Sequence, residues 1–406
     1  MPGLSLIALK DGFIPRGRGA LKTALPILLS SAFLFSFISI SCCQALLFLS
    51  FLVWLAGLVR REWKWTVPGF FRPLAVYAAL SLLAAFLSVN PEMSLKDSKD
   101  LLLFLVIPLI AAGLSTGADI GLAARAILVS GTASSLFSLG YFALKAAPGE
   151  RISGFVGHYM TQGGLLLLFG ALAVSVLLFW KSRERFIWGA AFILSTVALA
   201  LTYTRSAWVG LAVVLAFLLF LYKPKALILL PILAALAFAI SPSTLRYRVR
   251  SIFNPNAYSN RLRIEYFKAG VKIIEDFPLH GTGPDTVDLV FQDPKYGLSE
   301  DAKKNVHLHN NLTQIAAERG IPALFAWLLF MGWSLASCLR LLKDKRAPVY
   351  PYAAAAAASI LAMFVAGLFE FNFGDSEVVT LFLALLTLPF AGRPFPANAG
   401  SDQVGR

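Results

Sequence analysis

The chain has 406 residues, of which 58% are hydrophobic and only 14% carry a charge. Apolar runs about as long as the ~20 residues that cross a bilayer exclude an ordinary soluble globular protein and indicate an all-α polytopic membrane protein. The formal net charge of +14 fits basic loops beside anionic membrane lipids, and the chain has no basic, aromatic-interleaved motif typical of nucleic-acid-binding proteins.

Taken in chain order, the apolar runs predict about twelve transmembrane helices. Helices 1–9 fall within residues 1–241 and helices 10–12 within 320–392, with a polar loop at 242–319 and a tail at 393–406. Lys and Arg gather at both termini and in alternate loops, so the positive-inside rule predicts cytoplasmic termini and a 242–319 loop outside the cytoplasm. The predicted spans are 24–41, 43–59, 69–89, 100–116, 120–145, 162–180, 186–203, 206–222, 225–241, 320–342, 350–370 and 376–392.

Two turns early in the chain carry candidate binding residues on the same outer side. Arg151 and His158 share one loop, where they could line a cavity with later motifs. Arg205 lies between two apolar runs, at a turn where the positive-inside rule disfavours a cation. An arginine near membrane depth predicts a functional site, although its side chain can also extend to a lipid head group.

The 242–319 loop contains a periodic segment of its own. Apolar residues at helical spacing predict an amphipathic helix over 261–276 that lies at the membrane surface; they are Leu262, Tyr266, Ala269 and Ile273. Guanidinium groups bind phosphate through paired hydrogen bonds, so the basic residues of this helix are candidates for a diphosphate site. A solvated face resting on anionic lipid is the alternative for these residues, which are Arg261, Arg263, Lys268 and Lys272.

Two of the four histidines in the chain, His307 and His309, precede the tenth apolar run. Asn310 or Asn311 can cap a short helix that Gly320 ends. His309 then lies at a helix N-terminus at the rim of the membrane, where an imidazole is suited to act as a general base. The alternative is a surface histidine that supplements the cap, and His307 is the weaker candidate, with a supporting role.

Carboxylates follow the eleventh apolar run on the same outer side. Glu370 and Asp375 lie in the segment Glu-Phe-Asn-Phe-Gly-Asp-Ser-Glu, where they can pair with the arginines or simply solvate the loop. The chain contains no D-x-D, H-E-x-x-H, G-x-x-x-x-G-K-[ST] or G-x-S-x-G motif. We therefore predict no metal site and no cofactor, and no motif supports nucleotide use or a serine hydrolase.

Three of these segments together resemble the O-antigen ligase and O-antigen polymerase superfamily of bacterial envelope glycan enzymes. His309-Asn310, nine further residues and Gly320 are similar to that family's spacing of histidine, small amide or hydroxyl residue, and glycine. Thr204-Arg205-Ser206 is similar to its Ser/Thr-Arg-Ser/Gly turn, and 260–284 to its Arg-to-Pro-Leu-x-Gly-x-Gly segment. Ala323 departs from the pattern, because the family usually has Gly, Thr or Tyr there.

The resemblance implies a glycosyltransferase of the GT-C type in the bacterial inner membrane, with its active site in the periplasmic 242–319 loop. Its donor would be a glycan on undecaprenyl diphosphate and its acceptor a lipid A–core hydroxyl, without metal or nucleotide. Arg205 and Arg261 would stabilise the diphosphate and His309 would take the acceptor proton. An O-antigen polymerase, a protein O-oligosaccharyltransferase and a lipid-linked sugar transporter remain alternatives, although transport favours charged residues at mid-span.

Overall fold

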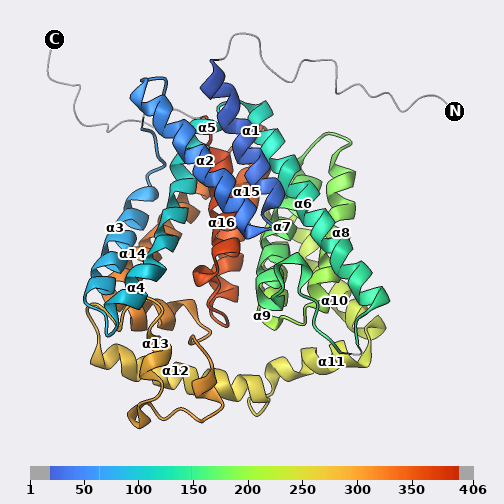
Figure 1. Ribbon diagram of the computed structural model, residues 1–406. Helices are drawn as coiled ribbons and strands as arrows, with labels where there is room; N and C mark the ends of the chain where they lie inside the picture. Colours follow the sequence, from blue (N-terminus) through green and yellow to red (C-terminus); the bar gives the residue numbers. More distant parts are fainter. Residues whose placement is uncertain (1–18, 64, 148, 393–406) are drawn as a thin grey trace.

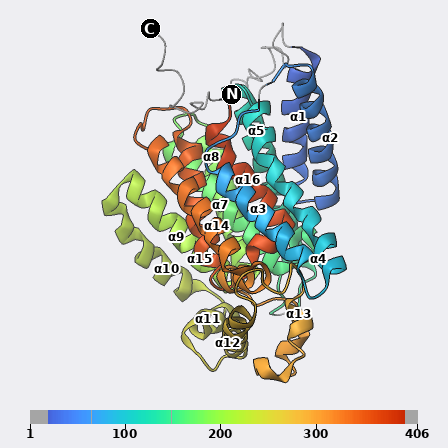
Figure 2. The same ribbon diagram turned by 90° about the vertical axis from the view of Figure 1, so that its left-hand side faces the viewer.

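The computed structural model describes residues 19–63, 65–147 and 149–392, and these residues form helices without β-strands. The two termini, 1–18 and 393–406, lie outside the described residues, so the cytoplasmic placement of the tail stays a prediction. Figures 1 and 2 show an upright bundle of helices with two helices, α11 (Ser243–Arg250) and α12 (Tyr258–Asp276), lying across one end. The 242–319 segment therefore forms an ordered layer at one end of the bundle.

The bundle is built mainly from apolar helices that follow the predicted spans closely, with one short polar helix, α4 (Pro91–Asp97), among them. In chain order they are α1 (Ala20–Phe35), α2 (Ile40–Val59), α3 (Phe71–Phe86), α4 (Pro91–Asp97), α5 (Val106–Gly113), α6 (Gly117–Leu144), α7 (Tyr159–Phe179), α8 (Arg185–Leu201), α9 (Arg205–Tyr222), α10 (Leu229–Ile240), α14 (Asn311–Leu341), α15 (Tyr350–Ala366) and α16 (Ser376–Thr387). A short helix, α13 (Val287–Val290), lies in the end layer.

Within the described residues, five helices are long and apolar enough to cross a membrane, namely α2, α6, α7, α9 and α14. Six shorter apolar helical segments accompany them. The predicted span 100–116 is interrupted, because a 3-10 helix, η1 (Ser98–Leu105), precedes α5. Pro108 lacks the N–H that would continue α-helical bonding back into η1. The fold is that of a helical membrane protein, while the count of twelve and the sidedness of the loops stay predictions.

The centre of the bundle is formed by α7, α15 and α16 (Figure 1). Six consecutive alanines, at 353–358, are all buried in α15, and small side chains let neighbouring helices approach closely. Thr161 at the start of α7 and Asp375 at the start of α16 lie at the end of the bundle that α12 covers. This packing places the polar ends of the central helices directly against the end layer.

The predicted helix break at Gly320 is confirmed. Gly320 has φ of 82° and ψ of 165°, which splits α14 into a short segment, 311–319, and a longer apolar segment. A Cβ atom at this position would lie 2.2 Å from the carbonyl oxygen of Leu279, so only glycine fits here. Asn310 caps the short segment as predicted, because its side chain accepts from the backbone N–H groups of Leu312 and Thr313.

The amphipathic helix predicted over 261–276 is also confirmed, as part of α12. Leu262, Tyr266, Ala269 and Ile273 are buried, and they belong to a second, smaller core beneath the end layer. The Tyr266 hydroxyl donates to the carbonyl oxygen of Ala302 at 3.1 Å. This small core fixes α12 against the short first segment of α14, which directly follows the two histidines.

Candidate active site

The histidine segment before α14 is fastened to the loop that follows α15. Asn310 donates through Nδ2 to the carbonyl oxygen of Leu368 at 2.9 Å, and Asn311 donates through Nδ2 to Oδ1 of Asn372 at 2.7 Å. The backbone N–H of Asn311 also donates to the carbonyl oxygen of Gly367 at 2.7 Å. Because buried amides need partners, these bonds fix the two loops in register and bring the histidines to the acidic loop.

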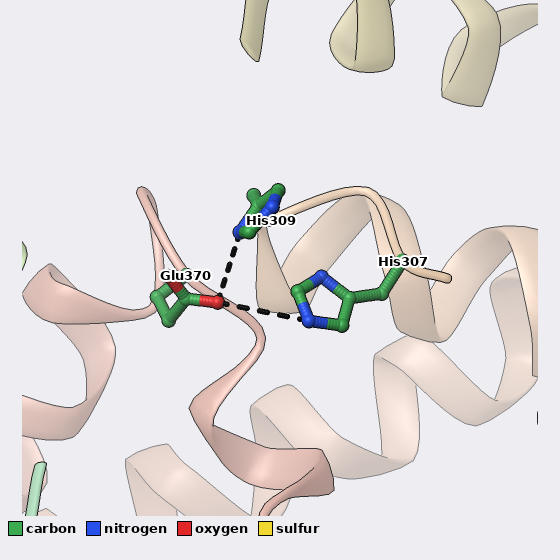
Figure 3. A group of neighbouring side chains, drawn as sticks. All are labelled: His307, His309 and Glu370. Carbon is green, nitrogen blue, oxygen red and sulfur yellow. Dashed lines mark hydrogen bonds and ion pairs between the residues drawn. The ribbon is translucent and has the colours of Figure 1, made fainter. Parts of the chain in front are cut away.

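His309 and Glu370 form the centre of the candidate site (Figure 3). His309 Nδ1 lies 2.9 Å from Oε1 of Glu370, and each side chain is only 11% exposed. The same oxygen accepts from the backbone N–H of Phe371 at 3.2 Å. His307 approaches it from another side, with Nε2 at 4.0 Å. Two residues that are 61 positions apart in sequence therefore form one hydrogen-bonded pair.

The carboxyl group of Glu370 is ionised in this environment. Burial alone would raise its pKa, but the hydrogen bond from His309 and the nearby positive charges, including that of Arg263, lower the pKa to about 2. An ionised carboxylate can only accept hydrogen bonds, so Nδ1 of His309 carries the proton of this pair. In the neutral ring, Nε2 of His309 is then the nitrogen that can accept a proton, and it makes none of the described hydrogen bonds.

The backbone at His309 is strained. Its φ of 51° lies in the left-handed region, which costs a residue with a side chain on the order of 1–3 kcal/mol. Among the described residues, the other non-glycine positions with positive φ are Arg61, Tyr203 and Asp285. Tyr203 lies two residues before Arg205, and Asp285 lines the cavity described below. Such residues persist where the surrounding structure holds them, which is common at functional sites.

His307 is a neutral neighbour of the pair. Its ring centroid lies 4.3 Å from that of His309, and burial lowers its pKa to about 4, with the Glu370 charge opposing this shift. Nδ1 of His307 is buried without a hydrogen-bond partner. His307 therefore lies close enough to shape the site, but its more accessible nitrogen faces Glu370.

These three residues are also the ones that could hold a metal ion. One ligand atom from each of His307, His309 and Glu370 lies within 4.8 Å of the others, and imidazole with carboxylate suits a divalent transition metal. Nδ1 of His309 is at hydrogen-bond distance from Glu370, so an ion bound there would replace that hydrogen bond. Nδ1 of His309 can therefore either hydrogen-bond to Glu370 or bind a metal ion, but not both at once. Activity measured with and without a chelator distinguishes these two states.

Arginines gather beside Glu370. Arg263 donates through Nε to the carbonyl oxygen of the residue before Glu370 at 3.0 Å, and burial lowers the pKa of its guanidinium while the Glu370 charge opposes this. Burial likewise lowers the pKa of Arg151 to about 10, with Arg248 and Arg263 acting in the same direction. Arg248, on α11, was not predicted, because its Arg-x-Arg-x-Arg segment carries no distinguishing spacing.

Arg205 lies in the same neighbourhood, since the charges of Arg248 and Arg263 act on it too. Its Nη1 donates to the carbonyl oxygen and Oγ of Ser251, and its Nη2 donates to Ser259 and Asn260 at 2.7 and 2.8 Å. Arg205 therefore ties the start of α9 to the start of α12. We call the set Arg151, Arg205, Arg248 and Arg263 the arginine group.

Within the described residues, no member of the arginine group forms an ion pair with a carboxylate. Arg151 instead donates to the carbonyl oxygens of Thr202 and Tyr203 at 2.9 and 3.2 Å, and its guanidinium lies 3.4 Å above the centre of the Tyr159 ring. Carbonyl and hydroxyl partners satisfy N–H donors but do not neutralise charge. The arginine group therefore keeps a net positive charge beside the His309–Glu370 pair.

The structure does not bring Arg261 and Lys268 to this group. Both side chains are exposed on the outer face of α12, and the guanidinium of Arg261 lies 5.8 Å from the Tyr258 ring centre. Arg263 is two residues from Arg261, which turns it to nearly the opposite face of the helix. One basic helix thus divides into an inward arginine and an outward basic face.

His158 and Asp375 are joined through Thr161. The Thr161 hydroxyl donates to Oδ2 of Asp375 at 2.5 Å and lies 3.1 Å from Nδ1 of His158. Burial and a neighbouring carboxylate raise the pKa of Asp375 to about 7. His158 and Asp375 line a cavity of about 370 Å³ together with His307 and Glu370. Glu377, from the same acidic segment as Glu370 and Asp375, also lines it, and the other charged lining residues were not predicted as site residues from the sequence: Asp97, Asp100, Asp285, Glu318 and Arg319.

Comparison with known proteins gives one finding that bears on this site. Residues 190–328 match the family model described as O-antigen ligase. No curated protein matches the chain. The matched segment contains Arg205, Arg248, Arg263 and both histidines of the site, whereas Arg151 and Glu370 come from outside it. The functional cluster therefore combines the matched segment with helices on either side.

Proposed function

We propose that this chain, whose residues 190–328 match the family model described as O-antigen ligase, transfers a glycan from a lipid-linked diphosphate donor to an acceptor hydroxyl. In its specific form, the donor is undecaprenyl-diphosphate glycan and the acceptor is lipid A–core. The reaction takes place at the periplasmic face of the bacterial inner membrane. The buried His309–Glu370 pair beside the unneutralised arginine group is the observation that carries the proposal.

His309 is the general base of the proposed reaction. Its Nε2 takes the proton of the acceptor hydroxyl while the hydroxyl oxygen bonds to the anomeric carbon of the donor sugar. The bond from that carbon to the diphosphate oxygen breaks, and its electron pair leaves with undecaprenyl diphosphate. Glu370 holds Nδ1 at 2.9 Å and stabilises the imidazolium that forms, in the manner of a carboxylate that orients a catalytic histidine.

The arginine group binds the departing diphosphate. Negative charge grows on the leaving oxygens, and guanidinium groups aimed at such charge stabilise the transition state. Arg263 is the nearest member to the pair, because its Nε contacts the residue before Glu370. For Arg261 and Lys268 we propose the other role that the sequence left open, which is contact with anionic lipid head groups.

The test is a transfer reaction with purified full-length protein, undecaprenyl-diphosphate glycan and lipid A–core, in the presence of EDTA. We expect a glycosylated lipid A–core product from the wild type and a rate about 10²–10⁴-fold lower for His309→Ala, as for loss of a general base. His280→Ala is the matched control, because His280 lies in the same matched segment but outside the site.

Different outcomes separate the alternatives. Loss of wild-type activity in EDTA, with recovery on adding a divalent metal, would assign the histidines to a metal ion. Lengthening of the lipid-linked glycan in place of lipid A–core modification would identify a polymerase. Full activity of His309→Ala would show that His309 is not the general base.

A further inference from the structure

The cavity beside the histidine pair is strongly acidic. Seven carboxylates line it, and we call it the carboxylate cavity; they are Asp97, Asp100, Asp285, Glu318, Glu370, Asp375 and Glu377. Its one arginine, Arg319, is already paired, with Nη1 at 2.6 Å from Glu318 and Nη2 at 3.6 Å from Asp97. No member of the arginine group lines this cavity. The cavity therefore carries a net negative charge next to a site that receives a diphosphate.

Three of the residues that line this space have a buried polar atom without a hydrogen-bond partner. Glu370 is 92% buried, since only 8% of its surface is exposed, yet its Oε2 has no hydrogen-bond partner. Nε of Arg319 and Nδ1 of His307 are also buried without partners. Buried polar groups in native proteins are nearly always satisfied, so unpartnered atoms around a cavity point to a polar ligand. The volume of about 370 Å³ lies in the ~300–1,000 Å³ range of small-molecule sites.

The carboxylate cavity adjoins an apolar groove. This groove, of about 570 Å³, shares Asp100, Leu103 and Ser376 with the cavity. Its walls are one face of α2 and the facing side of η1 and α5, and its apolar lining includes Leu47, Phe48, Phe51, Leu102, Val106 and Leu109. A polar cavity beside an apolar groove along membrane helices fits a molecule with a sugar head and a hydrocarbon chain.

The negative charge of the cavity indicates which of the two substrates it binds. A diphosphate placed among these carboxylates would be repelled, because like charges at such distances cost several kcal/mol. Sugar hydroxyl and ammonium groups, by contrast, donate hydrogen bonds to carboxylates. The diphosphate end of the donor is thereby directed to the arginine group, and the carboxylate cavity remains for the acceptor.

We propose that the carboxylate cavity and the apolar groove together bind the acceptor as a membrane-anchored glycan. The sugar that receives the transferred glycan lies in the cavity and is neutral or amine-bearing, not phosphorylated, and its hydrocarbon chain lies in the groove. This inference rests on the proposed transferase function and adds where the acceptor binds and which sugars it admits. The attacked hydroxyl reaches His309 past Glu370 and His307, which border both the cavity and the base.

The first test compares three synthetic lipids with the same alkyl chain as competitors of acceptor in the transfer reaction of the full-length protein. They carry glucose, glucosamine or glucose 6-phosphate. We expect the first two to inhibit, and the phosphorylated lipid to require a concentration at least about tenfold higher, from the like-charge penalty. Asp100→Asn and Asp285→Asn should reduce the difference in inhibitory concentration between the phosphorylated lipid and the other two. Asparagine tolerates the positive φ of Asp285.

The second test concerns the groove. Leu102→Trp fills it from an exposed position, so the KM for acceptor should rise about tenfold while the KM for donor stays unchanged. Leu49→Trp is the control, because Leu49 is also exposed but does not line the groove. Equal inhibition by all three lipids, or equal KM values for the two tryptophan variants, would overturn the inference while transfer itself continues. Absence of transfer in the wild type would instead count against the proposed function.

Discussion

The arginine group and the carboxylate cavity both adjoin Glu370 and differ in how their charges are satisfied. The arginines make hydrogen bonds to carbonyl and hydroxyl oxygens, which leave their positive charge in place. In the cavity, the single arginine is already paired with Glu318 and Asp97. The His309–Glu370 pair thus lies between the positively charged arginine group and the negatively charged cavity. That arrangement suits a reaction in which negative charge develops on the leaving group and a proton leaves the acceptor.

The largest expected effect comes from the residue that the two regions share. Glu370→Gln keeps the size of the side chain but removes the charge that fixes the His309 tautomer. We expect the transfer rate to fall about 10²–10³-fold, with less change in the KM for donor. The measurement is steady-state transfer with circular dichroism to check folding. A rate within a few-fold of wild type would mean that Glu370 pairs with nearby positive charge but does not need its own charge to fix the His309 tautomer.

His307 provides a pH test on the cavity side. Its pKa is about 4 in the folded protein, below the ordinary ~6.5, so the unfolded state binds the proton more tightly. Stability from this residue is therefore present above about pH 6.5 and is lost as the pH falls towards 4, by about 3 kcal/mol. Thermal unfolding from pH 7 to 4 should show a smaller loss for His307→Asn than for wild type. Parallel curves would contradict the buried, neutral state.

Two arginines on one helix sharpen the comparison on the positive side. Arg263→Lys should lower the transfer rate about 10–100-fold, because a single ammonium cannot reproduce the paired hydrogen bonds of a guanidinium. Arg261→Lys, on the exposed face of α12, should change it less than about threefold. The two variants are measured side by side at saturating acceptor. A larger effect of Arg261→Lys than of Arg263→Lys would instead indicate that the diphosphate binds at the outer face of α12.

The smallest effect is expected at Arg205 and concerns stability. Lysine would retain only part of its four hydrogen bonds to the 251–260 segment, which should cost about 1–2 kcal/mol. Limited proteolysis should then cleave this segment faster in Arg205→Lys than in Arg263→Lys. Unchanged proteolysis together with lost turnover would mean that Arg205 contributes to diphosphate binding but does not hold the 251–260 segment.

Local patterns in the sequence predicted the features that depend on neighbouring residues. Periodic apolar residues gave α12, and the combination of Asn310 and Gly320 gave the short helix and its break. The pairing of His309 with Glu370 could not be predicted, because it depends on how α14 and α15 pack. The contribution of Arg248 was hidden for the same reason, since nothing in its local sequence separates it from Arg246 and Arg250.

The distance in sequence between His309 and Glu370 also sets when the site can exist during synthesis. The chain emerges from its N-terminus, so the arginine group and both histidines are made before α15. Glu370 arrives only after α15, and Asn372 then bonds to Asn311 to fix the loop. A nascent chain that stops before this loop has His309 without the carboxylate that bonds to its ring. Reactivity towards lipid-linked sugars would then begin only when nearly the whole bundle is in the membrane.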